Sequence, residues 1–515
     1  MDKILSSFKN KYSVGFEDIP IPVIKKAKHF LIKPLVHVVN SSLISGIFPE
    51  KLKIAKIKSV FKTGCTSEPS NYRPLSILPT ISKIFERAVY LQLVDYLETN
   101  GLFDEEQHGF RVGKSVKTAS IDLTETIISA IDRGDNVIGI FLDLSKAFDS
   151  VSHTKLITIL YSLGIEGLPL KWLKSYLCNR KQYVELPFMM EDNKLVQVKS
   201  STKTVMHGVP QGSILGPILF LCYLKGLPNI LLNNDSKFCL YADDANLIIS
   251  GNTINNIELR AGNELLAINK YFNGKNLLLN AVKSNFISFH TKQNKKENNP
   301  SIFVGNNKIV QLDSTKFLGL TIDQHLSWDS HIKKLLNKIS SGLFAIRSMS
   351  RYCSIHILKT LYHAHIHSHI SFGISVYGAT SDLNLKSILL LQKKAIRVML
   401  NLNYTDSVKE HFSNLGILTV YALYIFETVI LVKEAGDNLP TLGSSHTYST
   451  RNRNKPAIKK HQLEFYNKKP SSAGIKFFYK LPTNLQSMTD LRLFKKDLKN
   501  YLICRALYSF EEFFE

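Results

Sequence analysis

The chain has 515 residues and a formal net charge of +23, and 44% of its residues are hydrophobic and 10% aromatic. This length allows roughly two to four domains with cores of their own, and the composition excludes a disordered tail protein and a collagen-like chain. The excess of Lys and Arg indicates a polyanionic partner, for which nucleic acid is the first candidate.

The first half of the chain alternates helical and strand-like patterns. Lysines interleave with apolar residues over 51–62, which predicts a basic strand or helix face. Helical apolar spacing runs over 77–97 and again over 115–131. The β-branched run VIGIFLD at 137–143 predicts a buried strand that ends in an acid. An apolar helix is expected to begin near Ile214.

The second half changes from mixed to helical patterns. Two apolar runs at 237–250 are broken by Asp243 and Asp244, which predicts a hairpin with the acids at its turn. The other elements expected here are a helix at 258–272, strands at 286–290 and 316–323, and mainly helices after residue 328. Polar, basic segments at 292–300 and 436–460 are predicted to be a loop and a surface linker.

Six cysteines are scattered with no CxxC pair, which argues against a zinc knuckle and a disulfide framework. The N-terminal segment lacks the apolar stretch of a signal peptide. The apolar run Val420 to Val432 is interrupted by Glu427 and is shorter than the roughly 20 residues of a membrane span. We therefore expect a soluble, intracellular protein without a membrane partner.

Two predicted strand ends carry acids 100 residues apart, Asp143 and the pair Asp243–Asp244. If the strands are neighbours, these carboxylates converge on one site. Mg²⁺ prefers such oxygen ligands, and two ions about 3.5–4 Å apart stabilise both oxygens of an in-line phosphoryl displacement. The alternative is that acids at a hairpin tip are solvated turn residues.

Further motifs favour the site. GVPQGSILGP at 208–217 places three glycines and two prolines around Gln211, so that backbone can closely approach a nucleotide or template. Together with FLDLSKAFDSVSH at 141–153 and YADD at 241–244, it resembles the palm motifs of reverse transcriptases, and is most similar to those of jockey-like non-LTR retrotransposons. Segments 61–87 and 108–115 resemble the family's finger motifs, and 277–289 and 316–323 resemble its later palm motifs. The resemblance covers roughly residues 10–400.

The resemblance implies a catalytic metal site. Asp143, Asp243 and Asp244 are expected to be catalytic and to hold two Mg²⁺, for which Mn²⁺ is a substitute, with the backbone carbonyl of Leu144 as a further ligand. Asp149 also matches the family, but we expect it to support structure.

The resemblance also implies a nucleotide site. Arg73 is the expected triphosphate clamp, with Lys62 a weaker candidate, since guanidinium binds phosphate bidentately. Phe148 is expected to exclude a 2′-hydroxyl and so favour dNTPs, although an ordinary core aromatic is an equal alternative on spacing alone. The remaining candidates are Gln211 and Gly212 beside the nascent base pair, and Lys283 at the departing pyrophosphate.

The implied fold is α+β, a polymerase right hand. The expected domains are an N-terminal extension with the fingers (1–136), a palm with an antiparallel sheet and some finger elements (137–326), a helical thumb (327–400) and a mainly helical C-terminal extension with a basic linker (401–515). The basic patch at 451–460 is a candidate RNA or DNA contact.

Two other motifs are not assigned a function. GFRVGKS at 109–115 is similar to a phosphate-binding P-loop, but it has three residues instead of four before GK and no preceding apolar strand, so ATPase activity is excluded. HAHIHSH at 363–369 would place His363 and His367 on one helix face and His365 and His369 on another. We favour a polar helix near the nucleic-acid backbone over a metal site.

The predicted function is RNA-directed DNA synthesis by a non-LTR element, with an RNA template, a DNA primer or target and dNTPs as partners. An RNA-binding protein of the element is a candidate partner, and a nuclear or cytoplasmic ribonucleoprotein is the expected location. Relatives of this kind carry an endonuclease domain before the polymerase, and this chain is expected to lack one. A catalytically inactive nucleic-acid-binding relic is the alternative, and an intron maturase is less favoured.

Overall fold

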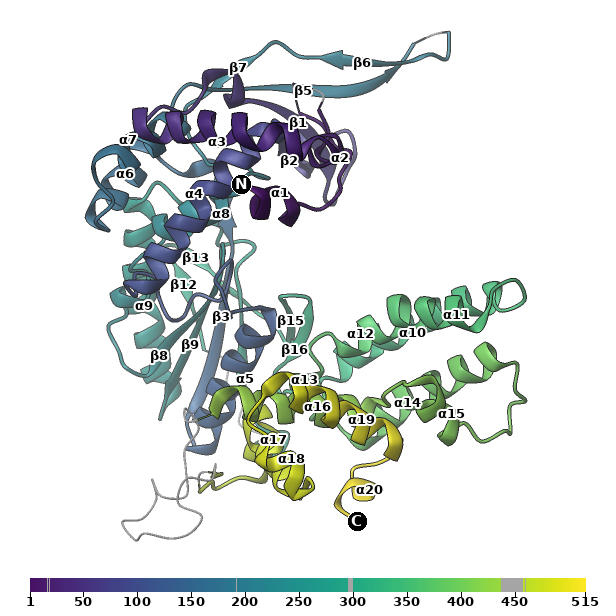
Figure 1. Ribbon diagram of the computed structural model, residues 1–515. Helices are drawn as coiled ribbons and strands as arrows, with labels where there is room; N and C mark the ends of the chain where they lie inside the picture. The colour runs from purple at the N-terminus through teal and green to yellow at the C-terminus, as the bar shows by residue number, and fades with distance from the viewer. Residues whose placement is uncertain (16, 18, 191, 295–299, 437–456, 459) are drawn as a thin grey trace.

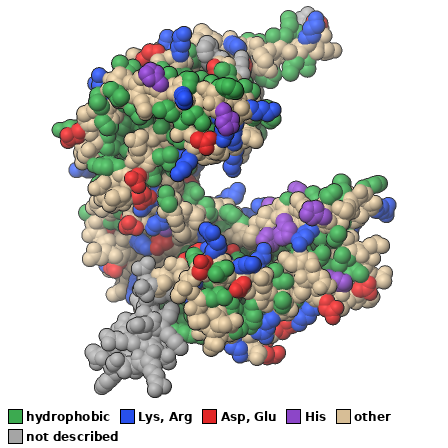
Figure 2. Space-filling model, viewed as in Figure 1, with side chains coloured by type: hydrophobic (Ala, Val, Ile, Leu, Met, Phe, Trp, Pro, Cys, Tyr) green, Lys and Arg blue, Asp and Glu red, His purple; other side chains and the backbone are tan. Residues whose placement is uncertain are grey.

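The computed structural model describes residues 1–515 except 16, 18, 191, 295–299, 437–456 and 459. The chain forms a finger lobe, a central palm sheet and a helical limb that projects from the palm (Figure 1). The space-filling view shows a hollow between the finger lobe and the limb (Figure 2). This arrangement is the right-hand polymerase fold that the sequence predicts.

The finger lobe combines N-terminal helices with a sheet of strand order β2-β1-β5-β6, in which β7 also pairs with β5. Its strands are β1 (Ile54–Phe61), β2 (Tyr72–Ile77), β5 (Arg180–Met189), β6 (Leu195–Lys199) and β7 (Lys203–Val205). Its helices are α1 (Asp2–Ser7), α2 (Ile21–Lys26), α3 (Lys28–Ser45), α4 (Thr80–Thr99), α6 (His153–Ser162) and α7 (Gly167–Leu177). The basic segment 51–62 is thus a strand, and β1 pairs antiparallel with β2 and parallel with β5.

The palm sheet has the order β14-β11-β3-β9-β8. Its strands are β3 (Asn136–Leu142), β8 (Ser236–Tyr241), β9 (Asp244–Gly251), β11 (Asn285–Phe289) and β14 (Val310–Gln311). All neighbours are antiparallel apart from β11 and β14. Smaller ladders join β4 (Leu144–Ser145) to β10 (Leu278–Leu279), β12 (Phe303–Val304) to β13 (Asn307–Lys308), and β15 (Ser314–Phe317) to β16 (Leu320–Asp323).

The palm sheet separates two hydrophobic cores, because successive side chains of a strand point to opposite faces. Ile138, Ile140 and Leu142 of β3 join the core shared with the finger lobe. Val137 and Phe141 join the core shared with the limb and the C-terminal helices. Burial on both faces explains why β3 has a continuous apolar sequence instead of an alternating one. Helices α5 (Val116–Asp132), α8 (Leu215–Tyr223) and α9 (Ile254–Gly274) complete the palm.

The limb and the C-terminal residues form one continuous core. Its longer helices are α10 (Asp329–Met349), α11 (Ile355–Tyr362), α14 (Asp382–Leu400), α16 (Val420–Ala435), α17 (Pro470–Lys480) and α19 (Leu491–Arg505). Its shorter helices are α12 (Ser368–Ser371), α13 (Ile374–Tyr377), α15 (Lys409–Leu415), α18 (Thr483–Ser487) and α20 (Glu511–Phe514). The core is not interrupted at residue 400, and the division into domains stays a prediction.

Most predicted elements are present, and two differ from expectation. The segment 316–323 is a tight hairpin, β15–β16, instead of one strand, since Leu318 adopts a left-handed φ of +45° between them. The histidine segment His363–His367 is a π-helix and not an α-helix. The linker 436–460 and the basic patch 451–460 fall largely outside the described residues, as does much of the loop 292–300. All six cysteines are free.

Among the described residues, no single helix is long and apolar enough to cross a membrane. Taken together, α15 and α16 have the length and composition of a membrane span, but the two helices are bent by 51° relative to each other.

Candidate active site

Strand pairing brings the three predicted acids to one edge of the palm sheet. In the β3–β9 ladder Leu142 lies opposite Ala245, so Asp143 leaves β3 beside Asp244 at the start of β9. Tyr241 pairs with Asp244, which leaves Ala242 and Asp243 as the two-residue turn of the β8–β9 hairpin. Ala242 has a φ of +55°, as turns of this length require. The predicted convergence of Asp143, Asp243 and Asp244 is therefore present.

The acids repel one another. Loss of hydration, and then the charge of Asp143, raises the pKa of Asp243. Although Asp244 is exposed as a residue, loss of hydration around its carboxylate and then the charges of Asp243 and Asp143 raise its pKa to about 6. The charges of Arg73 and Lys62 act in the opposite direction on both pKa values. A cluster of hard oxygen donors under mutual repulsion fits a divalent cation.

This repulsion predicts a pH effect on the metal-free protein. An acid with a raised pKa binds its proton more tightly in the folded state, so its contribution to stability falls as pH rises from 3.8 to about 6. In EDTA, the Tm of Asp244→Asn relative to wild type is expected to rise across this interval and then stay constant. Parallel thermal melts measure it. A Tm difference that stays constant or falls across the same interval contradicts the assignment.

The acidic turn is held from behind by the segment 106–109. The Gln107 side-chain oxygen accepts hydrogen bonds from the backbone N–H groups of Gly109 (2.8 Å) and Ala242 (2.9 Å). A side chain at Gly109 would collide with the backbone nitrogen of Ala242, so only glycine fits there. His108 continues this contact, because its backbone N–H donates to the carbonyl of Leu240 (2.8 Å). The motif at 109–115 that is similar to a P-loop thus begins with Gly109, which packs against the hairpin turn.

Asp143 is held on its other side by the turn that follows β10. Its carbonyl accepts from the N–H of Asn280 (2.8 Å), and its N–H donates to the hydroxyl of Ser284 (3.2 Å). Lys283 lies exposed within the same turn, adjacent to this contact. Leu144 is buried, and its backbone belongs to the short β4–β10 ladder. The structure thus places Lys283 and Leu144 beside Asp143, and their roles stay predictions.

The Gln211 loop is docked on the finger strand that carries Arg73. The carbonyl of Gln211 accepts from the N–H of Ser76 in β2 (2.8 Å). Gly212 has a φ of +119°, and a Cβ there would lie 2.6 Å from the Ser76 carbonyl oxygen. The Gln211 amide donates to Asp149 (2.9 Å). The loop therefore joins fingers to palm, and Asp149 has the supporting position that we expected.

Arg73 and Lys62 lie exposed on one face of the finger sheet. Val60 pairs with Arg73, and Lys62 follows two residues later with its N–H donating to the carbonyl of Asn71 (2.9 Å). Because alternate residues of a strand share a face, both cations point the same way. The charges of Arg73 and Lys62 lower the pKa values of Asp243 and Asp244, so both cations act electrostatically on the acids.

Phe148 is half-buried, and its ring stacks on Phe220 with centroids 4.5 Å apart. Its backbone carbonyl accepts from the N–H of Val209, at the start of the Gln211 loop (2.9 Å). The Phe148 ring thus packs against the core, and its backbone is hydrogen-bonded to the start of the Gln211 loop.

Two other clusters of possible metal ligands give weaker evidence of a functional site. Within the described residues, one group of three possible metal ligands has its donor atoms within 4.8 Å of one another, namely His108, Asp122 and Cys239. The carboxylate oxygens of Asp143, Asp243 and Asp244 therefore do not all lie within 4.8 Å of one another. Asp122 already pairs with Lys237 (2.5 Å), and Cys239 donates to the carbonyl of Ala119, so we interpret this cluster as structural.

The histidine segment has no α-helical faces, because it is a π-helix. His363 and His367 still approach, with ring centroids 5.0 Å apart, and burial lowers the pKa of His367 to about 4. Among the described residues, no third possible ligand lies close enough to His363 and His367 to complete a metal site.

Sequence reasoning missed Glu86, which is fully buried. Its carboxylate accepts from the N–H groups of Ile214 (2.7 Å) and Leu215 (3.3 Å), where α8 begins. It also accepts from the Ser82 hydroxyl (2.9 Å). Glu86 thus anchors the segment that follows the Gln211 loop. Its sequence neighbours give no sign of this role.

A protein-family model described as "Reverse transcriptase (RNA-dependent DNA polymerase)" matches residues 58–322. The chain belongs to the reverse transcriptase family. The matched range contains all the residues expected at the metal and nucleotide sites, and the predicted resemblance is confirmed at the level of the family.

Curated relatives of the chain include two proteins of Drosophila melanogaster mobile elements. The chain is 27% identical over 398 residues to "Probable RNA-directed DNA polymerase from transposon X-element", covering 76% of this chain and 42% of the relative. It is 28% identical over 376 residues to "RNA-directed DNA polymerase from mobile element jockey", covering 70% and 39%. The chain thus spans less than half the length of these relatives.

Solved structures with some likeness include apo telomerase from Candida tropicalis, with a TM-score of 0.40 and 13% identity over 77% of this chain and 68% of that one. Telomerase from Candida albicans in complex with an RNA fragment has a TM-score of 0.37 and 14% identity over 74% and 68%. Likenesses this low do not bear on function.

Proposed function

We propose that the chain is an RNA-directed DNA polymerase of a non-LTR retrotransposon. The observation that carries the proposal is the meeting of three carboxylates with two exposed cations and a glycine loop at the junction of fingers and palm. A nucleoside triphosphate needs this combination, since its phosphates seek cations while its reacting centre needs a divalent metal. The mobile-element relatives support the same conclusion.

Family membership and the donor set support a divalent cation, and we propose two Mg²⁺, replaceable by Mn²⁺, held by Asp143, Asp243, Asp244 and the Leu144 carbonyl. Bound there, the ions would neutralise charge that develops during in-line displacement at phosphorus. Asp143 and the hairpin acids keep fixed positions because backbone contacts hold both segments.

The other residues select and orient the nucleotide. Arg73 and Lys62 offer exposed positive charge to the triphosphate. Gln211 and Gly212 present backbone and amide to the nascent base pair, held by Asp149 and Ser76. The primer 3′-oxygen forms a bond to the α-phosphorus as the bond to pyrophosphate breaks, and we assign to Lys283 the stabilisation of the departing group.

An RNA template and a DNA primer are the proposed occupants of the hollow between finger lobe and limb (Figure 2). The net charge of +23 favours binding through phosphates, which makes affinity salt-dependent. An element RNA-binding protein and a nuclear or cytoplasmic ribonucleoprotein remain part of this proposal.

Primer extension tests the function. With an RNA template of defined sequence, an annealed DNA primer, four dNTPs and Mg²⁺, we expect a full-length complementary product. Omission of one dNTP should stop the product at the first position that needs it, which excludes untemplated addition. Binding of the primer–template without extension in either Mg²⁺ or Mn²⁺ would instead favour the inactive relic.

Phe148 gives a prediction about sugar selection. Phe148→Val replaces the ring that stacks on Phe220 by a smaller side chain, so space opens where a 2′-hydroxyl would lie. We expect the ratio of kcat/KM for rNTP to that for dNTP to rise by about 10- to 200-fold, the range for a pocket gaining or losing a small group. Single-nucleotide insertion kinetics measure it. An unchanged ratio would assign Phe148 to the core alone.

A further inference from the structure

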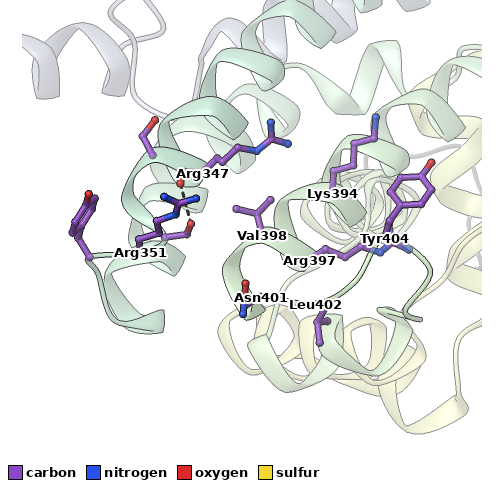
Figure 3. Close-up of a pocket in the computed structure, with 11 residues that line it drawn as sticks. Arg347, Arg351, Lys394, Arg397, Val398, Asn401, Leu402 and Tyr404 are labelled. Atoms are coloured by element: carbon purple, nitrogen blue, oxygen red, sulfur yellow. Dashed lines mark hydrogen bonds between the residues drawn. The ribbon is translucent and has the colours of Figure 1, made fainter.

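A basic pocket lies at the free end of the limb, between the ends of α10 and α14 (Figure 3). Its volume is about 760 Å³. Arg347 and Arg351 come from α10 and the turn after it, and Lys394 and Arg397 come from α14. The 21-residue helix α10 is about 30 Å long, so the pocket is well separated from the β15–β16 end of the palm.

The pocket carries uncompensated positive charge. Its lining includes four cations and no acid. In the described part of the chain, no carboxylate lies within 4.0 Å of Arg347, Arg351 or Lys394, whereas Arg397 donates to the carbonyl of Asp406 (3.0 and 3.1 Å). Cations near helix C-termini complement the helix dipole, which accounts for Arg347 and Arg397. It does not account for Arg351, which lies beyond α10.

Two tyrosines at the pocket are strongly exposed. Tyr352 is 83% and Tyr404 78% exposed, although aromatic rings normally bury their faces. Val398 and Leu402 supply apolar surface beside them. Exposed aromatic rings between cations are the arrangement by which proteins bind unpaired nucleic acid, since bases stack on the rings while phosphates contact the cations.

We propose that this pocket binds an unpaired nucleic-acid strand. Arg347, Arg351 and Lys394 bind phosphates, and Tyr404 and Tyr352 stack on bases. A duplex fits less well, because its bases are already stacked on each other and present no free face. The site anchors a single-stranded segment of template or target outside the polymerase cleft, and its binding does not depend on nucleotide addition.

Fluorescence anisotropy tests the proposal with the full chain and labelled RNA and DNA strands of about 12 nucleotides, within the known size range of such sites. Arg347→Gln/Arg351→Gln/Lys394→Gln should weaken binding and reduce the slope of log K against log salt by about 2, since each phosphate contact contributes about 0.7. Tyr404→Ala should weaken binding about 5- to 100-fold without changing that slope. The RNA and DNA arms identify which strand the pocket prefers.

The matched control is Lys270→Gln/Arg492→Gln/Lys496→Gln, which removes three exposed charges from α9 and α19. Melting curves confirm that all variants fold. The proposal is overturned if the pocket variant loses no more affinity than the control. It is also overturned if the variant loses duplex affinity to the same degree, or if millimolar inorganic phosphate alone displaces the strand.

Discussion

Asn in place of Asp143 or Asp243 is expected to lower the single-turnover rate of nucleotide addition by about 10³-fold or more. Loss of one carboxylate would remove a proposed metal ligand, and removal of a single electrostatic stabiliser at other active sites already costs about 10²–10³-fold. Preloaded primer–template, mixed with dNTP and Mg²⁺ in a rapid-quench instrument, gives the rate free of binding effects.

The structure supplies controls for this prediction. Asn relieves the repulsion that raises the pKa values of Asp243 and Asp244, so the metal-free variants should melt no lower than wild type. Asp149→Asn keeps an acceptor for the Gln211 amide and is expected to retain the rate within about 10-fold. Equal losses in Asp149→Asn and Asp243→Asn would show that the three-acid assignment is wrong.

Glu86→Ala is expected to destabilise the finger and palm core by about 3–5 kcal/mol, as removal of one member of a buried charged network does. The change strips acceptors from two N–H groups at the start of α8 and from Ser82. It also leaves Arg180 buried, whose charge opposes the burial that raises the pKa of Glu86.

Urea unfolding followed by fluorescence measures this loss, since Trp172 lies buried in the same core. Asp95→Ala on the exposed side of α4 is the control, and its expected change is within about 0.5 kcal/mol. Glu86→Gln keeps the shape and one acceptor oxygen and should fall between them. A Glu86→Ala variant as stable as the control would remove Glu86 from the set of residues that position the Gln211 loop.

The sequence was sufficient to predict the elements that carry the acids. β3 and the β8–β9 hairpin have apolar runs that end in Asp143 and are interrupted by Asp243–Asp244, and local pattern determines both. The family resemblance supplied the order of the motifs. The pairing of β3 with β9 was left open by the sequence and is a finding of the structure.

The features that the sequence did not predict depend on contacts between segments that are distant in the chain. Glu86 lies in an ordinary amphipathic helix, and its partners Ile214 and Leu215 are about 130 residues away. Gln107 is equally plain in sequence, yet it fixes the turn at Ala242 from 135 residues away. The π-helix at His363–His367 lies against α10, where Gly342 leaves room for the backbone of His365, and no local pattern signals that contact.

The proposed chemistry requires two segments 100 residues apart to form one cation site. Fe²⁺ in place of Mg²⁺, with ascorbate and peroxide, generates hydroxyl radicals that cut the backbone next to the bound ion. We predict cuts beside both Asp143 and Asp243–Asp244 in the wild type, and loss of both in Asp243→Asn. Cuts at only one segment, or at both segments with undiminished yield in the variant, would contradict a shared site.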